Sequence, residues 1–300
     1  KYVFYKRRQH VQKILLNSLY GVLGLPIFRF YDVDNAEAVT TTGVSVIKFS
    51  RKIANHYYNK ILGDTEDHCI YIDTDSVFFS ALPIVEKTMP HVDVKNDNEM
   101  ATAILEVADN VQTFINKSYD VMAKRFFNIE EHRYDIKQEV IAKASMWLAK
   151  KRYAQWIINN NGVTCDELEV KGLDVVRSSF PTRFREFMTE ILKDILKDVP
   201  KEEIDEKIVT LKKQVKNESV DDIAKTSAVK NISKYVKMMD KGAVMGECAK
   251  STPAHVKSSI IHNQFLRKFN IQSEPIRDGE KIKWIYLKNN ELGLDALAFR

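Results

Sequence analysis

The sequence has few cysteines and no apolar run long enough to cross a membrane. Its three cysteines, Cys69, Cys165 and Cys248, stand far apart in the chain. This spacing argues against a disulfide framework and a thiolate zinc site, and it favours a reducing compartment such as the cytoplasm. No stretch approaches the roughly 18–20 apolar residues of a transmembrane helix, and no signal peptide is visible.

Acidic residues are missing from the first part of the chain. Residues 1–31 carry six lysines and arginines, and the first carboxylate is Asp32. The whole chain is only mildly basic, with 46 Lys and Arg against 41 Asp and Glu and a net charge of +5. That balance permits a polyanionic partner without requiring one. The local absence of acids strengthens the case for an anionic ligand near the start of the chain.

A Met is also missing from the first position, and a helical pattern begins almost at once. We therefore expect this sequence to be part of a longer protein. Its 300 residues, 44% of them hydrophobic, are enough to bury a sizeable core in about two domains. No internal repeat or low-complexity tract occurs.

Residues 4–23 have the period of an amphipathic helix, which Gly21, Gly24 and Pro26 end. Its apolar stripe consists of Val11, Ile14, Leu15, Ser18 and Val22. The opposite face aligns Lys6, His10, Lys13, Asn17 and Tyr20 at spacings of three and four. A basic stripe of this kind is more often a solvated face than a ligand site.

The rest of the chain predicts an α+β protein, with an antiparallel sheet, long packing helices and a mainly helical second part. Strands are expected at residues 27–31, 134–142, 146–158 and 281–287. Helices are expected at residues 35–62, capped by Asn35, and at 100–127, 182–199, 201–216, 219–236 and 255–269. Residues 81–99 contain two prolines and are interpreted as a surface connection. The domain boundary is placed near residue 171.

Residues 69–80 carry the clearest chemical signal of the chain. Two apolar runs flank Asp73-Thr74-Asp75, which predicts a strand, an acidic turn and a returning strand. Hard cations such as Mg²⁺ take carboxylate oxygens and usually share their site with substrate phosphates. The alternative is structural, because Asp is common in turns, where its side chain bonds the backbone.

Four motifs in fixed order resemble those of family B DNA polymerases, and their spacing is most similar to that of the replicative enzymes of T-even-like phages. Lys13-Ile-Leu-Leu-Asn-Ser-Leu-Tyr-Gly21 resembles the fingers motif K-x-x-x-N-S-x-Y-G. Tyr71-Ile-Asp-Thr-Asp-Ser76 resembles the palm motif Y-G-D-T-D-S, with Ile72 in place of the glycine. Lys150-Lys-Arg-Tyr153 resembles K-K-R-Y. Lys171-Gly-Leu-Asp174 is similar to the segment that opens the thumb.

The resemblance implies a fingers helix at residues 1–24, a partial palm at 25–171 and a thumb at 172–300. It makes Asp75 the principal ligand of two Mg²⁺ ions and Asp73 its companion, with Glu139 a weaker candidate ligand; Mn²⁺ could replace Mg²⁺. It assigns dNTP binding to Lys13, Asn17 and Tyr20. It assigns primer–template DNA to Lys150, Lys151, Arg152, Tyr153, Lys171 and Arg177.

One family motif has no match. The family's other palm carboxylate lies in a D-x-x-S-L-Y-P-S sequence, and nothing in residues 1–300 matches it. The exonuclease motifs and the tail that contacts a sliding clamp are not recognisable either. We therefore expect the chain alone to be inactive in primer extension, and the missing N-terminal half and a clamp are candidate partners.

Three other functions stay open on the sequence. The chain could be a non-catalytic primer–template binding module, or one part of a split polymerase. A metal-dependent nuclease or phosphohydrolase also uses paired carboxylates, although it leaves the helix at residues 13–21 unexplained. Reverse transcriptases share the chemistry, but their paired aspartates are adjacent, unlike Asp73 and Asp75.

Overall fold

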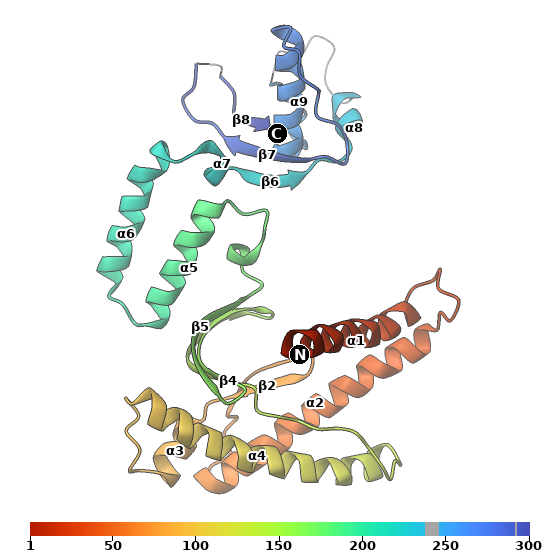
Figure 1. The fold of residues 1–300 in the computed structure, drawn as a ribbon, viewed down its shortest axis with the longest axis vertical. Helices are drawn as coiled ribbons and strands as arrows, with labels where there is room; N and C mark the ends of the chain where they lie inside the picture. The colour runs from red at the N-terminus through yellow and green to blue at the C-terminus, as the bar shows by residue number, and fades with distance from the viewer. Residues whose placement is uncertain (238–245, 292) are drawn as a thin grey trace. The chain divides into compact units, whose positions relative to one another are not determined.

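The computed structural model describes residues 1–237, 246–291 and 293–300, and it mixes α-helices with antiparallel sheet (Figure 1). It divides into two compact units, which are described separately below. The first comprises residues 1–141 and 158–164, and the second comprises residues 142–157 and 165–300. Among the described residues, no helix is both long enough and apolar enough to cross a membrane.

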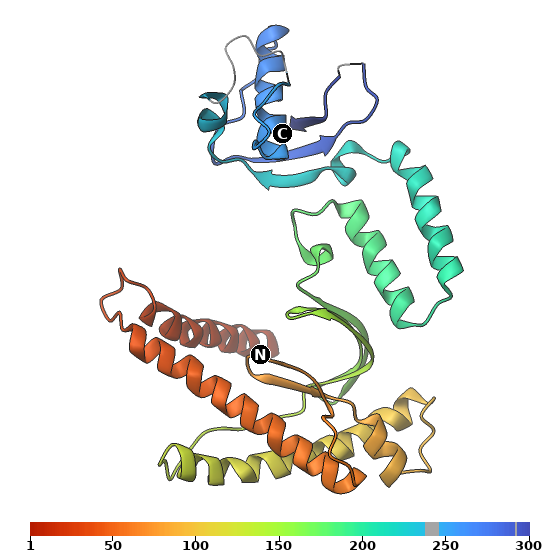
Figure 2. The ribbon, with the colours of Figure 1, turned by 180° about the vertical axis from the view of Figure 1, so that it is seen from behind.

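The first unit begins with two long helices, α1 (Tyr2–Leu23) and α2 (Val33–Leu62), which run side by side in both views (Figures 1 and 2). The predicted strand at residues 27–31 is wrong. Phe28 N–H donates to the Leu25 carbonyl at 2.9 Å, so the segment after Pro26 forms successive turns. The cap of α2 is Asp32 rather than Asn35, because the Asp32 carboxylate accepts the Asn35 N–H at 3.0 Å.

Two further helices, α3 (Leu82–Thr88) and α4 (Asp97–Phe126), complete the core of this unit. Helix α3 lies in the predicted surface connection at residues 81–99, so that interpretation was wrong. Pro83 stands in the first turn of α3, where a missing N–H costs nothing, and Ile84 and Val85 behind it are buried. The core around them is formed by Tyr58, Ile84, Val85, Ala103 and Val107. Asn96 caps α4 by accepting two backbone N–H groups.

The middle sheet has the order β3 (Val140–Ala149), β4 (Arg152–Asn160), β5 (Val163–Lys171). Two strand predictions are corrected here. Residues 134–139 are not a strand, because α4 side chains bond their backbone: Asn116 accepts the Ile136 N–H at 2.9 Å. The predicted strand at 146–158 is two strands with a turn at Lys150 and Lys151, where Lys151 has φ of 61°.

In the second unit, β5 is followed by α5 (Thr182–Leu196) and α6 (Lys201–Gln214), which confirm the two predicted amphipathic helices. A short 3₁₀ turn, η1 (Asp174–Val176), precedes α5. The apolar side of α5 packs on the sheet in a core that consists of Ala154, Leu173, Val175, Leu192 and Leu196. Lys207 of α6 contacts two carboxylates of α5, Glu190 at 2.8 Å and Asp194 at 2.7 Å.

The C-terminal part of this unit is less helical than the sequence predicted. Residues 219–236 form α7 (Val220–Ile223), β6 (Lys225–Ala228) and α8 (Ile232–Lys237) instead of one helix. Strand β6 pairs antiparallel with β7 (Lys281–Tyr286), which pairs antiparallel with β8 (Ala296–Phe299). Helix α9 (Ala254–Lys268) covers this sheet through a shared core of Val256, Ile260, Ile282, Trp284 and Ala296.

The stability of this C-terminal part should fall in mild acid because of His262 on α9. Its Nδ1 lies 3.0 Å from the Ala298 carbonyl, and burial, with a smaller contribution from Arg300, lowers its pKa below the usual 6.5. The unfolded chain therefore binds a proton that the native state excludes, so stability is lost as pH falls from about 6.5 through the lower native pKa. Thermal unfolding followed by tryptophan fluorescence between pH 7.5 and 5 measures this loss.

His262→Gln should flatten this pH dependence, while His10→Gln, which removes an exposed histidine from α1, should leave it as in the wild type. If stability depends on pH equally in the wild type and both variants, then His262 does not take up a proton when the protein unfolds. His255, also on α9, has a pKa lowered by burial and accounts for any slope that His262→Gln leaves.

Candidate functional site

The acidic turn lies at the tip of a two-stranded hairpin, as predicted. Strands β1 (Cys69–Asp73) and β2 (Ser76–Phe79) are antiparallel, and Asp73 is paired with Ser76 across the two-residue turn of Thr74 and Asp75. Thr74 has φ of 53°, which closes the turn. Ser76 Oγ donates to the Asp73 carbonyl at 3.1 Å, and Thr74 Oγ1 donates to the Asp73 carboxylate at 3.1 Å.

The base of the hairpin is held by aromatic packing. Phe79 contacts Tyr58 of α2 with ring centroids 5.1 Å apart, and Tyr71 lies across from Phe78 at 6.1 Å. Tyr58 is buried, and burial raises the pKa of its phenol far above its usual value. The turn itself is open, with Asp75 exposed and Asp73 half-buried. The fold therefore presents the two carboxylates on a supported tip.

The donor set of this tip fits a divalent metal, since two carboxylates one residue apart supply the oxygens that Mg²⁺ prefers. It is not a complete set. Within the described ranges, no three His, Cys, Asp or Glu side chains group closely enough to hold a metal ion. Glu139 is exposed in the segment before β3, where its carbonyl accepts the Asn161 N–H at 2.6 Å.

Helix α1 carries the predicted polar stripe. Lys13, Asn17 and Tyr20 lie on one uninterrupted helix at spacings of four and three, and all three are exposed. On the opposite, apolar stripe too, no residue of α1 is buried. Val11, Ile14 and Leu15 are each at least half exposed.

The K-K-R-Y residues form a tight turn rather than a run along one strand. Lys150 and Lys151 make the turn between β3 and β4, and Arg152 opens β4; all three are exposed. Tyr153 is buried, with its ring 4.5 Å from that of Trp147. The strand predicted at residues 146–158 is therefore interrupted within this motif. Three basic groups project from the turn, and Tyr153 packs beneath it.

Gly172 brings the next basic residues against this turn. A Cβ atom at Gly172, which has φ of +67°, would lie 1.9 Å from the Lys151 carbonyl oxygen. Only glycine allows this approach. The sequence motif contains this glycine, but nothing in the motif indicated that Gly172 packs against the backbone of Lys151.

Two of the predicted DNA-binding cations have acidic neighbours in this structure. Lys171 Nζ lies 2.8 Å from Glu169, whose hydrogen bond raises the pKa of the ammonium group. Arg177 lies 3.1 Å from Asp174. Both ion pairs are accessible to solvent, and such pairs contribute little to stability. An incoming phosphate can therefore replace the carboxylate.

The predicted site residues fall into two groups. Lys13, Asn17 and Tyr20 belong to the first unit together with Asp73, Asp75 and Glu139. Lys150, Lys151, Arg152, Tyr153, Lys171 and Arg177 belong to the second unit.

The match to a known protein family covers the residues of both groups. The family description "DNA polymerase family B" matches residues 1–297. The chain is 28% identical to the DNA-directed DNA polymerase of Escherichia phage RB69 over 96% of its length, and 28% identical to that of Enterobacteria phage T4 over 96%. It is 26% identical to the DNA polymerase alpha catalytic subunit of Xenopus laevis over 73% of its length.

The chain covers only part of each relative. It spans 32% of each phage polymerase and 13% of the Xenopus laevis subunit. Since the family match extends over nearly all of the chain, from the α1 stripe through the acidic hairpin to the C-terminal sheet, the chain belongs to DNA polymerase family B.

Proposed function

We propose that this chain is the palm and thumb portion of a DNA-directed DNA polymerase, with one fingers helix. The fingers helix comprises residues 1–24, the palm 25–171 and the thumb 172–300. The observation that carries the proposal is the supported hairpin tip with Asp73 and Asp75, in a chain of which residues 1–297 match family B. The reaction is transfer of a nucleotide from a dNTP to a primer 3′-hydroxyl.

Asp75, exposed in the turn, is the principal metal ligand, and Asp73 assists from the end of β1. Two Mg²⁺ ions bound there would activate the primer hydroxyl and stabilise the leaving pyrophosphate. Lys13 supplies a point charge to the triphosphate, as lysines do in phosphate sites. Asn17 hydrogen-bonds near the same phosphates, and Tyr20 packs by the nascent base pair.

The primer–template is bound by the exposed cations of the second unit. Lys150, Lys151 and Arg152 contact phosphates from the turn, and Lys171 and Arg177 continue the track. Phosphate contacts fix register without reading sequence, which suits an enzyme that copies any template. Tyr153 contributes indirectly: its ring packs on that of Trp147, and this contact holds the turn in place.

The partner of α1 is the remaining polymerase polypeptide, which would bring the second palm carboxylate. The support is the apolar surface that α1 leaves open: Val3, Phe4, Leu15, Leu16 and Leu19 are each 59–69% exposed. Exposed apolar area of this extent is typical of an interaction site. A sliding clamp is a further candidate partner of the complete enzyme. We place that enzyme in the cytoplasm, which is the cytoplasm of the host cell if the enzyme is phage-encoded.

The chain alone should bind primer–template DNA without extending it. The family's other palm carboxylate has no match in residues 1–300, whereas the basic residues predicted to bind DNA are all present. In a gel shift the dissociation constant should rise steeply with salt, because bound phosphates release counterions. In the same buffer with Mg²⁺ and dNTPs, no extended primer should form.

Extension by residues 1–300 that is lost in Asp75→Ala would contradict the predicted inactivity and locate the activity in this chain. Binding that is absent, or indifferent to salt, would contradict the polymerase proposal.

A non-catalytic primer–template binding module is the second candidate function. It is favoured by the absence of a third metal-ligating side chain beside Asp73 and Asp75 in the described part of the chain. The two candidates differ when the upstream polypeptide is supplied, since only a polymerase then extends primers. DNA cleavage with Mn²⁺ by the chain alone would instead indicate a nuclease.

A further inference from the structure

The segment that leads into the acidic hairpin is held against α2 by polar side chains. Arg51 and Asn55 lie one turn apart on α2, and both contact Asp67, the second residue before β1. Asn55 Nδ2 donates to Asp67 Oδ1 at 2.7 Å, and Arg51 Nη2 donates to the other carboxylate oxygen. Asp67 Oδ1 also accepts the N–H of Cys69, the first residue of β1, at 3.1 Å. Hydrogen bonds from Arg51 and Asn55 hold the pKa of Asp67 below its usual value.

Asn55 makes a second contact with the same stretch of backbone. Its Oδ1 accepts the His68 N–H at 2.9 Å, so one amide side chain bonds both Asp67 and His68. The His68 ring stacks on Tyr58 of α2 with centroids 5.5 Å apart, and Tyr58 in turn contacts Phe79 of β2. A single exposed ion pair would contribute little to stability. Here the carboxylate accepts from three donors, and both ends of the hairpin contact α2.

A β-bulge at Ile70 lies directly after this anchor. At the base of the hairpin Cys69 is paired with Phe79, whereas at the tip Asp73 is paired with Ser76. Strand β1 has five residues and β2 has four, so one residue of β1 stays unpaired and the register shifts there. A shift of one residue turns every side chain of a strand to the opposite face. The position of Cys69, together with the bulge, therefore determines which face of the hairpin Asp73 occupies.

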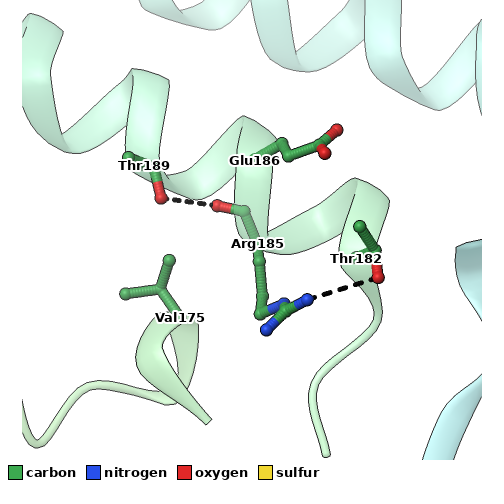
Figure 3. A pocket seen from close by; sticks show the side chains of 5 residues that line it. All are labelled: Val175, Thr182, Arg185, Glu186 and Thr189. Atoms are coloured by element: carbon green, nitrogen blue, oxygen red, sulfur yellow. Dashed lines mark hydrogen bonds between the residues drawn. The ribbon is translucent and has the colours of Figure 1, made fainter. Parts of the chain in front are cut away.

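The polar side chains around a hollow at the start of α5 are arranged differently. This hollow, of about 400 Å³, is lined by Val175 of η1 and by residues of α5 (Figure 3). Arg185 Nη2 donates to Thr182 Oγ1 at 3.3 Å, and the Thr189 hydroxyl donates to the Arg185 carbonyl at 2.7 Å. These hydrogen bonds join residues of one helix and hold no other element in place. The contacts of Asp67, in contrast, join α2 to the strand that ends in Asp73.

We propose that Asp67, held by Arg51 and Asn55, is a positioning residue for the proposed metal ligands Asp73 and Asp75. In this role Asp67 acts through β1, whose register it fixes, rather than as a ligand. The inference rests on the proposed function and adds to it the contacts that orient the ligands. Loss of an outer contact that orients a metal ligand typically lowers metal affinity or activity by about 10- to 100-fold.

The first test is hydrogen exchange of residues 1–300, which requires neither metal nor activity. In Asp67→Asn, the paired backbone amides of β1 and β2 should exchange about tenfold faster than in the wild type, because a lost charged hydrogen bond favours local opening. Asn55→Ala, which removes contacts from the side of α2, should act in the same direction. The amides of α4 should keep their wild-type rates. The matched control is Glu66→Gln, which removes one exposed negative charge at the neighbouring position and should leave the hairpin unchanged.

The second test is the Mg²⁺ dependence of single-turnover extension by the complete polymerase, in which this chain is supplied with the upstream polypeptide. Asp67→Asn should raise the Mg²⁺ concentration for half-maximal rate about tenfold. The half-saturating dNTP concentration and the dissociation constant for primer–template should stay as in the wild type, and Glu66→Gln should match the wild type in all three. In an Asp75→Asn background, Asp67→Asn should add little further loss, since residues that act through one another are not additive.

The outcomes separate this inference from the proposed function. If the complete wild-type polymerase does not extend primers, the proposed function fails. If it extends them and Asp67→Asn keeps the wild-type Mg²⁺ dependence, or the wild-type exchange of the hairpin, Asp67 is not a positioning residue. If Asp67→Asn weakens the binding of Mg²⁺, dNTP and DNA equally, the residue only supports the fold, and that result also overturns the proposal.

Discussion

Gly172→Ala should destabilise the second unit by about 3 kcal/mol and weaken DNA binding with it. Two costs add at this position. The left-handed conformation, with φ of +67°, costs an L-residue with a Cβ roughly 1–2 kcal/mol. The new methyl group would also lie 1.9 Å from the Lys151 carbonyl oxygen and 3.0 Å from its carbonyl carbon, and overpacking of this kind costs about 1–3 kcal/mol.

The clash is with backbone, so no side chain can rotate away to relieve it. Either β5 moves away from the turn at Lys150 and Lys151, or the turn opens. Both displace exposed cations that are proposed to bind DNA. Urea unfolding gives the loss of stability, and a gel shift gives the loss of affinity.

Gly162→Ala is the matched control. Gly162 has φ of +81°, and no atom lies within 4 Å of the position that a Cβ would take. Gly162→Ala therefore has the conformational cost of the left-handed backbone without the clash, and we expect it to lower the free energy of unfolding by about 1 kcal/mol. Equal losses in the two variants would show that the contact with Lys151 does not constrain Gly172.

The long helices could be predicted from the sequence because their burial follows a helical period. The apolar residues of α2 and α4 recur at three and four, and both helices end within a few residues of their predicted bounds. The hairpin at Asp73 and Asp75 was equally clear, since two β-branched and aromatic runs flank a polar turn. These elements depend on local pattern, and local pattern is what a sequence displays.

The errors occurred where tertiary contacts outweigh local preference. The turn at Lys150 and Lys151 carries no Gly, Pro, Asn or Asp, so nothing marked it as a turn. Residues 134–139 alternate like a strand, yet Asn116 and Gln112 of α4 take up their backbone N–H groups. Residues 225–228 were assigned to a helix, although β7 recruits them as an edge partner.

The candidate site was predicted as a set of residue types, not as an arrangement. The sequence identified Tyr153 as a DNA-binding residue, whereas the structure buries it against Trp147, a residue that no motif contained. It also did not single out Asp67, because one carboxylate in a polar connection resembles any other. What distinguishes Asp67 is its pair of donors on α2, Arg51 and Asn55, and these contacts appear only when the segment before β1 is folded against α2.

Asp75→Asn should reduce primer extension by a factor of about 10³ or more in the complete polymerase. Charge stabilisation by catalytic metals contributes several kcal/mol to such a reaction, and each 1.36 kcal/mol corresponds to a factor of ten in rate. An amide lacks the negative charge that binds the ions. The measurement is single-turnover extension with Mg²⁺ by this chain joined to, or mixed with, the polypeptide that carries the missing palm carboxylate.

Asp73→Asn should have a smaller effect, because the two carboxylates differ in their surroundings. Asp75 is exposed at the tip and is available to metal on its open side, whereas Asp73 is half-buried and accepts a hydrogen bond from Thr74 Oγ1 at 3.1 Å. One oxygen of the Asp73 carboxylate thus already accepts a hydrogen bond within the hairpin. We expect a loss of about tenfold to a hundredfold, with the order of the two variants as the diagnostic result.

Asp205→Asn is the matched control, since it removes one exposed carboxylate from α6 and changes the net charge equally. It should extend primers at the wild-type rate. All three variants should bind primer–template with dissociation constants close to that of the wild type, because the hairpin supplies no cation to the DNA. A loss of DNA binding in Asp75→Asn that matches its loss of rate would instead make the hairpin a structural support for the duplex and remove the metal role from Asp75.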